Sequence, residues 1–127
     1  MEKFESDNWK MWIEGDIAYV IYLAEHITYD IVEEGIKRRL EMTKDKSYLM
    51  FSDIRKIKSM TREGRQRMAQ KDAGYGTIAA AILSNSKVQE VIFNFFNAIY
   101  KSPAPAKMFT DEKKAIAWLQ QFNIRTE

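Results

Sequence analysis

The sequence contains no cysteine, a single histidine and no long apolar run. The absence of cysteine excludes disulfide bonds and thiolate metal sites. The longest apolar run, Ile78 to Leu83, is far shorter than the ~20 residues that a membrane-spanning helix needs. The first ten residues, MEKFESDNWK, lack the apolar centre of a secretory signal, so we expect a cytoplasmic protein.

Catalytic and cofactor motifs are also scarce. His26 lies between a predicted strand and a helix cap at Thr28, where a hydrogen-bonded surface histidine is the ordinary expectation. The chain has no Gly-x-Ser-x-Gly elbow, no phosphate loop and no histidine-rich metal spacing. Gly74-Tyr75-Gly76 precedes a strand, whereas phosphate binding needs a helix N-terminus there. We therefore expect a protein that is not an enzyme, with no catalytic residues, no metal and no cofactor.

What the chain does contain is a core and a concentration of positive charge. At 127 residues, with 46% hydrophobic and 30% charged residues, it suits a single domain over residues 1–127. The net charge is only +2, but one basic segment leaves the remainder net acidic. Such a segment is ordinarily a solvated face; the sharper interpretation is a partner surface, for which we favour protein over nucleic acid. It comprises Arg55, Lys56, Lys58, Arg62, Arg65, Arg67 and Lys71.

The apolar pattern predicts alternating strands and helices. Residues 9–23 alternate on both sides of Gly15-Asp16, which is typical of a β-hairpin with a short glycine turn. Thr28 is the expected N-cap of a helix over residues 29–43. Apolar runs at 47–54 and 77–84 predict strands buried on both faces, with a helix at about 62–72 between them.

The C-terminal part continues this alternation. A capping box from Ser86 to Gln89 and a wide apolar stripe predict a third helix, the best-buried one. Residues 102–109 predict a strand whose prolines suit a sheet edge, and Thr110 is the expected cap of a last helix. The order ββαβαβαβα predicts an α/β fold with a mixed sheet of four to five strands and about four helices. Its N-terminal hairpin is antiparallel and is followed by parallel βα units.

Several of these segments resemble one family. The hairpin, the strand YLMFSDI, the turn into SMTREGR, the strand AAAIL and the closing FTDEKKAIAWL are similar to the STAS domain of anti-sigma-factor antagonists. They resemble still more closely the small bacterial proteins grouped as SpoIIAA-like or STAS/SEC14-like. The resemblance covers the chain from about Trp9 to Phe122 and implies regulation through protein contacts.

The resemblance also implies a phosphorylation switch at the helix after the second of these segments. Anti-sigma-factor antagonists carry roughly Asp-Ser-Ser-Gly there, and placing the glycine at Gly64 puts Glu63 at the phosphorylated serine. The acceptor hydroxyl is therefore missing, and we expect a domain without the usual phosphoserine switch. Glu63 then either mimics a locked charged state or only complements the helix dipole, which is the simpler interpretation. Ser59 and Thr61 are alternative acceptors, although Thr61 is also the natural N-cap.

A ligand-binding alternative rests on the carboxyl ends of the strands, where ligands bind in open α/β sheets. The residues expected there are Asp53, Ser84, Asn85 and Ser86, which suit a small anionic ligand, although Ser84 to Ser86 also fit a simple helix cap. The SEC14-like side of the resemblance implies a lipid instead. Our preferred interpretation is a non-enzymatic regulatory domain that binds a protein, and a homodimer through Trp12 or Phe93 is a further alternative.

Overall fold

The computed structural model of the protein describes residues 3–44, 46–68, 70–85 and 104–122. A six-stranded mixed sheet forms its centre, with the strand order β1-β2-β3-β5-β7-β8. The first two pairings are antiparallel and the other three are parallel. The strands are β1 (Lys3–Glu5), β2 (Trp9–Glu14), β3 (Ile17–Tyr22), β5 (Tyr48–Asp53), β7 (Thr77–Leu83) and β8 (Ala106–Phe109).

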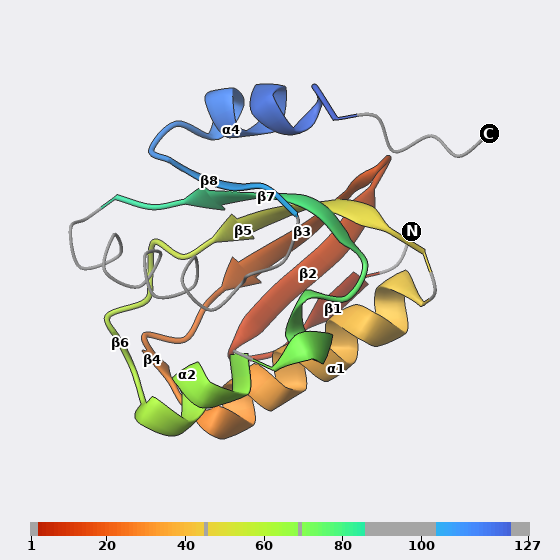
Figure 1. Cartoon of the computed structure of the whole chain (residues 1–127). Helices are drawn as coiled ribbons and strands as arrows, with labels where there is room; N and C mark the ends of the chain where they lie inside the picture. The colour runs from red at the N-terminus through yellow and green to blue at the C-terminus, as the bar shows by residue number, and fades with distance from the viewer. Residues whose placement is uncertain (1–2, 45, 69, 86–103, 123–127) are drawn as a thin grey trace.

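Helices cover both faces of this sheet. Figure 1 shows α4 (Glu112–Leu119) over one face and α1 (Tyr29–Thr43) with α2 (Arg62–Met68) beneath the other. A 3-10 turn, η1 (Lys71–Gly74), follows α2. Beside α2, the short strands β4 (His26–Ile27) and β6 (Ser59–Met60) form a separate parallel ladder.

The predicted α/β class and the mixed sheet are confirmed. The sheet has one strand more than predicted, because the three-residue β1 pairs with β2 and buries little beyond Phe4. The edge position predicted for the proline-flanked strand is correct for β8. The third helix, its capping box from Ser86 and the Phe93 contact all lie outside the described residues.

Local chemistry explains the hairpin and the first helix. Gly15 adopts φ +61°, a left-handed conformation that glycine takes at little cost, and closes a two-residue turn between Glu14 and Ile17. The Thr28 hydroxyl accepts a hydrogen bond from the Ile31 N–H, so α1 begins at Tyr29 as predicted.

Two predicted helix boundaries are wrong. The helix expected at about 62–72 ends at Met68, because the chain turns at Arg67, whose guanidinium bonds the side chains of Gln70 and Asp72. The last helix is capped by Asp111 instead of Thr110. The Asp111 carboxylate accepts from two backbone N–H groups of the first turn, which a charged acceptor does more strongly than a hydroxyl.

Two apolar layers hold the sheet between its helices. On the α4 face, Phe51 and Leu83 pack with Leu119. On the α1 face, Met11 and Val20 pack with Ile36. The alternation of side chains along β3 and β5 sends apolar residues to both faces, which confirms the predicted double burial of the strand at 47–54.

The tightest approach between helix and sheet is at Gly35. A Cβ atom built there would lie 2.3 Å from the Trp9 ring. The ring has little room to retreat, because it is buried and its Nε1–H donates to the Ile31 carbonyl of the same helix at 2.9 Å. Gly35 therefore sets the distance between α1 and β2.

We predict that Gly35→Ala destabilises the protein although alanine favours helices. Overpacking costs about 1–3 kcal/mol, which exceeds or offsets the ~1 kcal/mol of helix propensity gained. Chemical denaturation measures the difference, with the exposed Lys37→Ala in the same helix as the matched control. Equal stability of the two variants would contradict the close contact.

A buried guanidinium joins α2 to the rest of this face. The Arg67 side chain is only 8% exposed and forms ion pairs with Glu33 of α1 and Asp72 of η1. Hydrogen bonds from Arg67 hold the pKa of Asp72 below its ordinary range, against the opposing effect of burial. The cluster of Arg67, Glu33 and Asp72 therefore fixes α2 and η1 against α1.

We predict an acid-sensitive contribution from this cluster. Because the folded pKa of Asp72 lies below the ordinary 3.8, its stabilisation is complete above that value and is lost as pH falls through the folded pKa. In urea titrations between about pH 6 and 2, Asp72→Asn should flatten the acid-induced loss of stability relative to the wild type. The exposed Asp7→Asn is the control, and identical pH profiles for all three proteins would contradict the prediction.

Candidate functional site

The turn between β5 and α2 presents positive charge to solvent because its apolar residues point inward. Ile54 and Ile57 are almost completely buried, and the residues between and after them are exposed. We call the four exposed basic residues of this turn and of the start of α2 the basic corner: Arg55, Lys56, Lys58 and Arg62.

Backbone hydrogen bonds hold the basic corner in place. The N–H groups of Lys58 and Ser59 both donate to the Glu25 carbonyl, at 2.7 and 3.1 Å. The Thr61 N–H donates to the Ile27 carbonyl at 2.9 Å, next to the β4–β6 ladder. The corner is therefore a fixed surface against the segment that precedes α1.

Two side chains of the corner have acidic neighbours within the chain. Arg55 donates from Nε and Nη2 to the two carboxylate oxygens of Asp53, at 3.0 and 2.8 Å, and these bonds raise the pKa of Arg55. The Lys58 ammonium lies 3.5 Å from the Glu25 carboxylate, with both side chains exposed. The exposed Lys58–Glu25 pair can exchange readily with a partner, because such a pair contributes little to stability.

Three residues of the predicted basic surface do not belong to the corner. Arg67 is buried in its ion pairs, so it is not available to a partner. Arg65 is half-buried and donates to the Met60 carbonyl at 2.9 Å. The Lys71 side chain lies outside the described part of the structure.

The predicted phosphorylation positions lie beside the corner but differ in their surroundings. Ser59 is exposed, and its hydroxyl lies 2.6 Å from Nδ1 of His26 on the neighbouring strand. The Thr61 hydroxyl accepts from the Gly64 N–H at 3.0 Å and so serves as the N-cap of α2. Glu63 is exposed in the first turn of that helix. Of the two hydroxyls, only that of Ser59 does not cap α2.

The residues predicted for a ligand at the strand ends are brought together but are already engaged. Asp53 and Leu83 are in register on adjacent strands, which places Ser84 next to this end of β5. The Asp53 carboxylate is occupied by Arg55, and Ser84 is only 2% exposed, with its N–H donating to the Phe109 carbonyl. Asn85 is exposed, and Ser86 lies outside the described residues.

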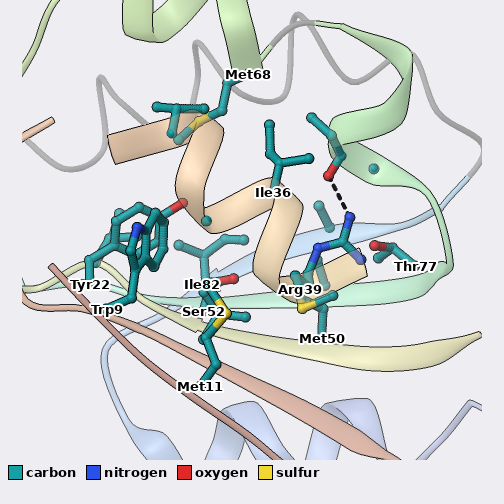
Figure 2. A pocket seen from close by; sticks show the side chains of 18 of the residues that line it. Trp9, Met11, Tyr22, Ile36, Arg39, Met50, Ser52, Met68, Thr77 and Ile82 are labelled. Atoms are coloured by element: carbon teal, nitrogen blue, oxygen red, sulfur yellow. Dashed lines mark hydrogen bonds between the residues drawn. The ribbon is translucent and has the colours of Figure 1, made fainter. Parts of the chain in front are cut away.

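The structure instead contains a cavity on the α1 face of the sheet, with a volume of about 130 Å³ (Figure 2). Its lining is mostly apolar and includes Trp9, Met11, Tyr22 and Met50, while Arg39 lies at one end. No sequence motif predicted this cavity. The nearest signal is the presence of small residues where helix and strands face each other, at Gly35, Ala80 and Ala106.

Within the described residues, no group of three or more histidine, aspartate or glutamate side chains could hold a metal ion. No helix of the described part is long and apolar enough to cross a membrane. Trp12, a candidate dimer contact, is half-buried and stacks on Tyr19 with ring centroids 4.7 Å apart.

Comparison with solved structures identifies the fold of the protein. The protein is similar to an uncharacterized protein of the DUF3478 family with a SpoIIAA-like fold from Shewanella loihica PV-4. The identity is 17% and the TM-score 0.65, over 87% of this chain and 91% of the other. A protein of unknown function from Arthrobacter sp. FB24 matches at 25% identity with a TM-score of 0.35, over 88% of this chain and 99% of the other.

The SpoIIAA-like fold expected from the sequence is therefore confirmed. No curated protein matches the sequence. The family comparison matches residues 11–123, nearly the whole chain. The protein belongs to the family described as Domain of unknown function (DUF7793).

Proposed function

We propose that the protein is a non-enzymatic regulatory domain that binds an acidic surface of another protein through the basic corner. The observation that carries this proposal is the exposed group of Arg55, Lys56, Lys58 and Arg62 on a backbone fixed by hydrogen bonds to Glu25 and Ile27. A rigid surface with an excess of positive charge attracts an acidic partner and fixes its orientation without first losing backbone entropy.

The burial pattern of this turn supports the proposal. Two buried isoleucines anchor it, so basic residues can be presented without exposing an apolar patch. The Arg55–Asp53 pair also holds one guanidinium in a defined orientation. The fold comparison adds only that the same architecture occurs in an uncharacterized protein.

Charge reversal at the corner tests the proposal. We predict that Lys56→Glu, Lys58→Glu and Arg62→Glu together abolish capture of the partner from the protein's own cells, because like charges then face each other. The matched control reverses three exposed lysines elsewhere, Lys37, Lys113 and Lys114, and should retain capture. Circular dichroism confirms that both variants are folded.

The salt dependence of capture is part of the same experiment. Raising the salt from about 0.05 to 0.5 M should weaken a charge-driven contact at least ~10-fold. Equal capture by the corner variant and the control variant, or capture that is insensitive to salt, would contradict the proposal. Loss of binding in both variants would show that overall charge is what matters, which also contradicts a local surface.

Phosphorylation at Ser59 is the regulation that fits this surface best. A phosphoryl group adds a charge of about −1.5 to −2 and three acceptor oxygens. At Ser59 it would lie beside Lys58 in sequence and His26 across the ladder, and it would offset the positive charge that the partner is proposed to recognise. Phosphorylation of Thr61 would instead disrupt the N-cap of α2.

We predict that Ser59→Glu weakens capture of the partner, whereas Ser59→Ala does not, because only the former adds negative charge to the corner. Mass spectrometry of protein from its own cells should find a phosphate on Ser59. Unmodified Ser59 under every growth condition, together with normal capture by Ser59→Glu, would remove this form of regulation and leave the binding proposal intact.

Glu63 stands at the position that the STAS resemblance assigns to the phosphorylated serine. Glu63→Gln separates the two roles considered for it. If Glu63 only complements the helix dipole, Glu63→Gln lowers the stability by a few tenths to ~1 kcal/mol and leaves capture of the partner unchanged. If Glu63 instead mimics a phosphorylated serine, Glu63→Gln changes capture of the partner and leaves the stability of the protein unchanged.

A further inference from the structure

The cavity on the α1 face is larger than the voids that protein cores ordinarily contain. Protein interiors are packed nearly as densely as organic crystals, with few voids larger than a water molecule. This cavity measures about 130 Å³, and an engineered apolar cavity of about 150 Å³ is known to stay dry and to bind benzene. A volume of this size therefore suits one small ring.

Most of the cavity lining is apolar and adaptable. Trp9 and Tyr22 lie together at one end, with ring centroids 4.3 Å apart (Figure 2). Three methionines also line the volume, namely Met11, Met50 and Met68. Thioether side chains are flexible and polarizable and make favourable contacts with aromatic rings. These walls therefore suit an aromatic or apolar molecule.

One hydroxyl interrupts this apolar lining. Ser52 of β5 is in register with Val20 on one side and Ile82 on the other, and all three residues line the cavity. Along β5 and just beyond it, the neighbours that face the same side are Met50 and Ile54, which are buried and apolar. No described residue forms a hydrogen bond with the Ser52 hydroxyl, so it is available to a ligand.

A hydroxyl in such surroundings favours a ligand with a hydrogen-bonding group. Burying a hydroxyl without a partner costs stability, and a hydrogen bond with a ligand removes that cost. A water molecule is a poorer occupant, because buried waters make roughly two to four hydrogen bonds and the residues around Ser52 are apolar. A single oxygen on an otherwise apolar molecule matches this single hydroxyl.

The positive charge at the opposite end of the cavity is engaged within the protein. The Arg39 guanidinium donates to the carbonyl oxygens of Tyr75 and Ala73 at 2.8 and 2.9 Å. Beside the larger effect of the hydrogen bonds from Arg67, the charge of Arg39 also lowers the pKa of Asp72. Burial of a charged ligand without a counter-ion of its own is costly, so these contacts favour a neutral ligand.

We propose that this cavity binds a small neutral molecule with an apolar ring and one hydroxyl or carbonyl oxygen. The ring lies among Trp9, Met11 and Met50, and the oxygen forms a hydrogen bond with the Ser52 hydroxyl. The site goes beyond the proposed function, because it uses no residue of the basic corner. It also differs from the strand-end loops, since neither Asp53 nor Ser84 lines it.

Phenol, benzene and benzoate are the probes. Phenol is uncharged at neutral pH and carries the hydroxyl that benzene lacks, whereas benzoate is an anion. In methyl NMR of methionine-labelled protein, phenol and benzene should shift the signals of Met11, Met50 and Met68 and leave that of Met60, which does not line the cavity. Benzoate should bind at least ~10-fold more weakly than phenol. Absence of these shifts, or benzoate binding as tight as that of phenol, would contradict the proposal.

The Ser52→Ala variant separates the hydrogen bond from the apolar contacts. It should lower the affinity for phenol about 2- to 10-fold, as the loss of one hydrogen bond implies, and leave the affinity for benzene unchanged. Without a probe, urea denaturation should show no loss of stability, because no described residue bonds this hydroxyl. The matched control is Ser47→Ala at an exposed position just before β5. Unchanged phenol affinity, or a loss of stability without a probe, would overturn the role of Ser52.

A filled cavity provides the second variant. Ala80 lines the cavity from β7, so Ala80→Leu should reduce the affinity for both phenol and benzene at least ~10-fold. The same change at the exposed Ala117 of α4 is the control and should leave both affinities as in the wild type. Circular dichroism establishes that both variants fold.

Crystal structures of the wild type, free and soaked with phenol, test the site without any substitution. Density for the ring between Trp9 and Met50, with the phenol oxygen at Ser52, is the expected result. The proposal is overturned if phenol fails to bind, if Ala80→Leu binds it as well as the wild type, or if another side chain of the protein fills the volume.

Discussion

The ion pairs of the Arg67 guanidinium with Glu33 and Asp72 are the interaction on which the basic corner and the cavity of this protein depend. The guanidinium is buried between Glu33 of α1 and Asp72 of η1, and it is contributed by a helix of only seven residues. So short a helix has little stability of its own, because most of its backbone groups lack helical partners. Removing one partner of a buried ion pair is costly, so this cluster strongly constrains where α2 lies.

Two features follow from that placement of α2. Its C-terminal side and η1 supply Met68, Ala73 and Gly74 to the lining of the cavity. Arg62 is the first residue of α2, and the other residues of the basic corner lie in the turn that precedes this helix. The corner is also held by hydrogen bonds to Glu25 and Ile27, so its shape does not rest on the helix alone.

The local signals in the sequence predicted much of this fold. Thr28 and the apolar periodicity gave both ends of α1, and the alternation around Gly15-Asp16 gave the hairpin. These succeeded because the determining contacts lie within a few residues. The Asp111 cap was missed because Thr110 and Asp111 are both good capping residues, and their sequence alone does not rank them.

The sites were harder to predict because they depend on distant residues. Arg67 lies in a basic run that indicates exposure, yet its partner Glu33 is 34 positions away. His26 and Ser59 are 33 positions apart and meet only through the two-residue β4–β6 ladder. The cavity depends on three-dimensional packing between α1 and the sheet, which a hydrophobic pattern identifies as core without measuring how well it is filled.

Recognition at the basic corner is the central claim, and hydrogen exchange of the protein alone and with its captured partner tests it most directly. The partner should slow exchange of the backbone N–H groups over residues 54–62, which includes those of Arg55, Lys56 and Arg62. Slower exchange confined to the other face of the sheet or to α4, with residues 54–62 unchanged, would contradict the account.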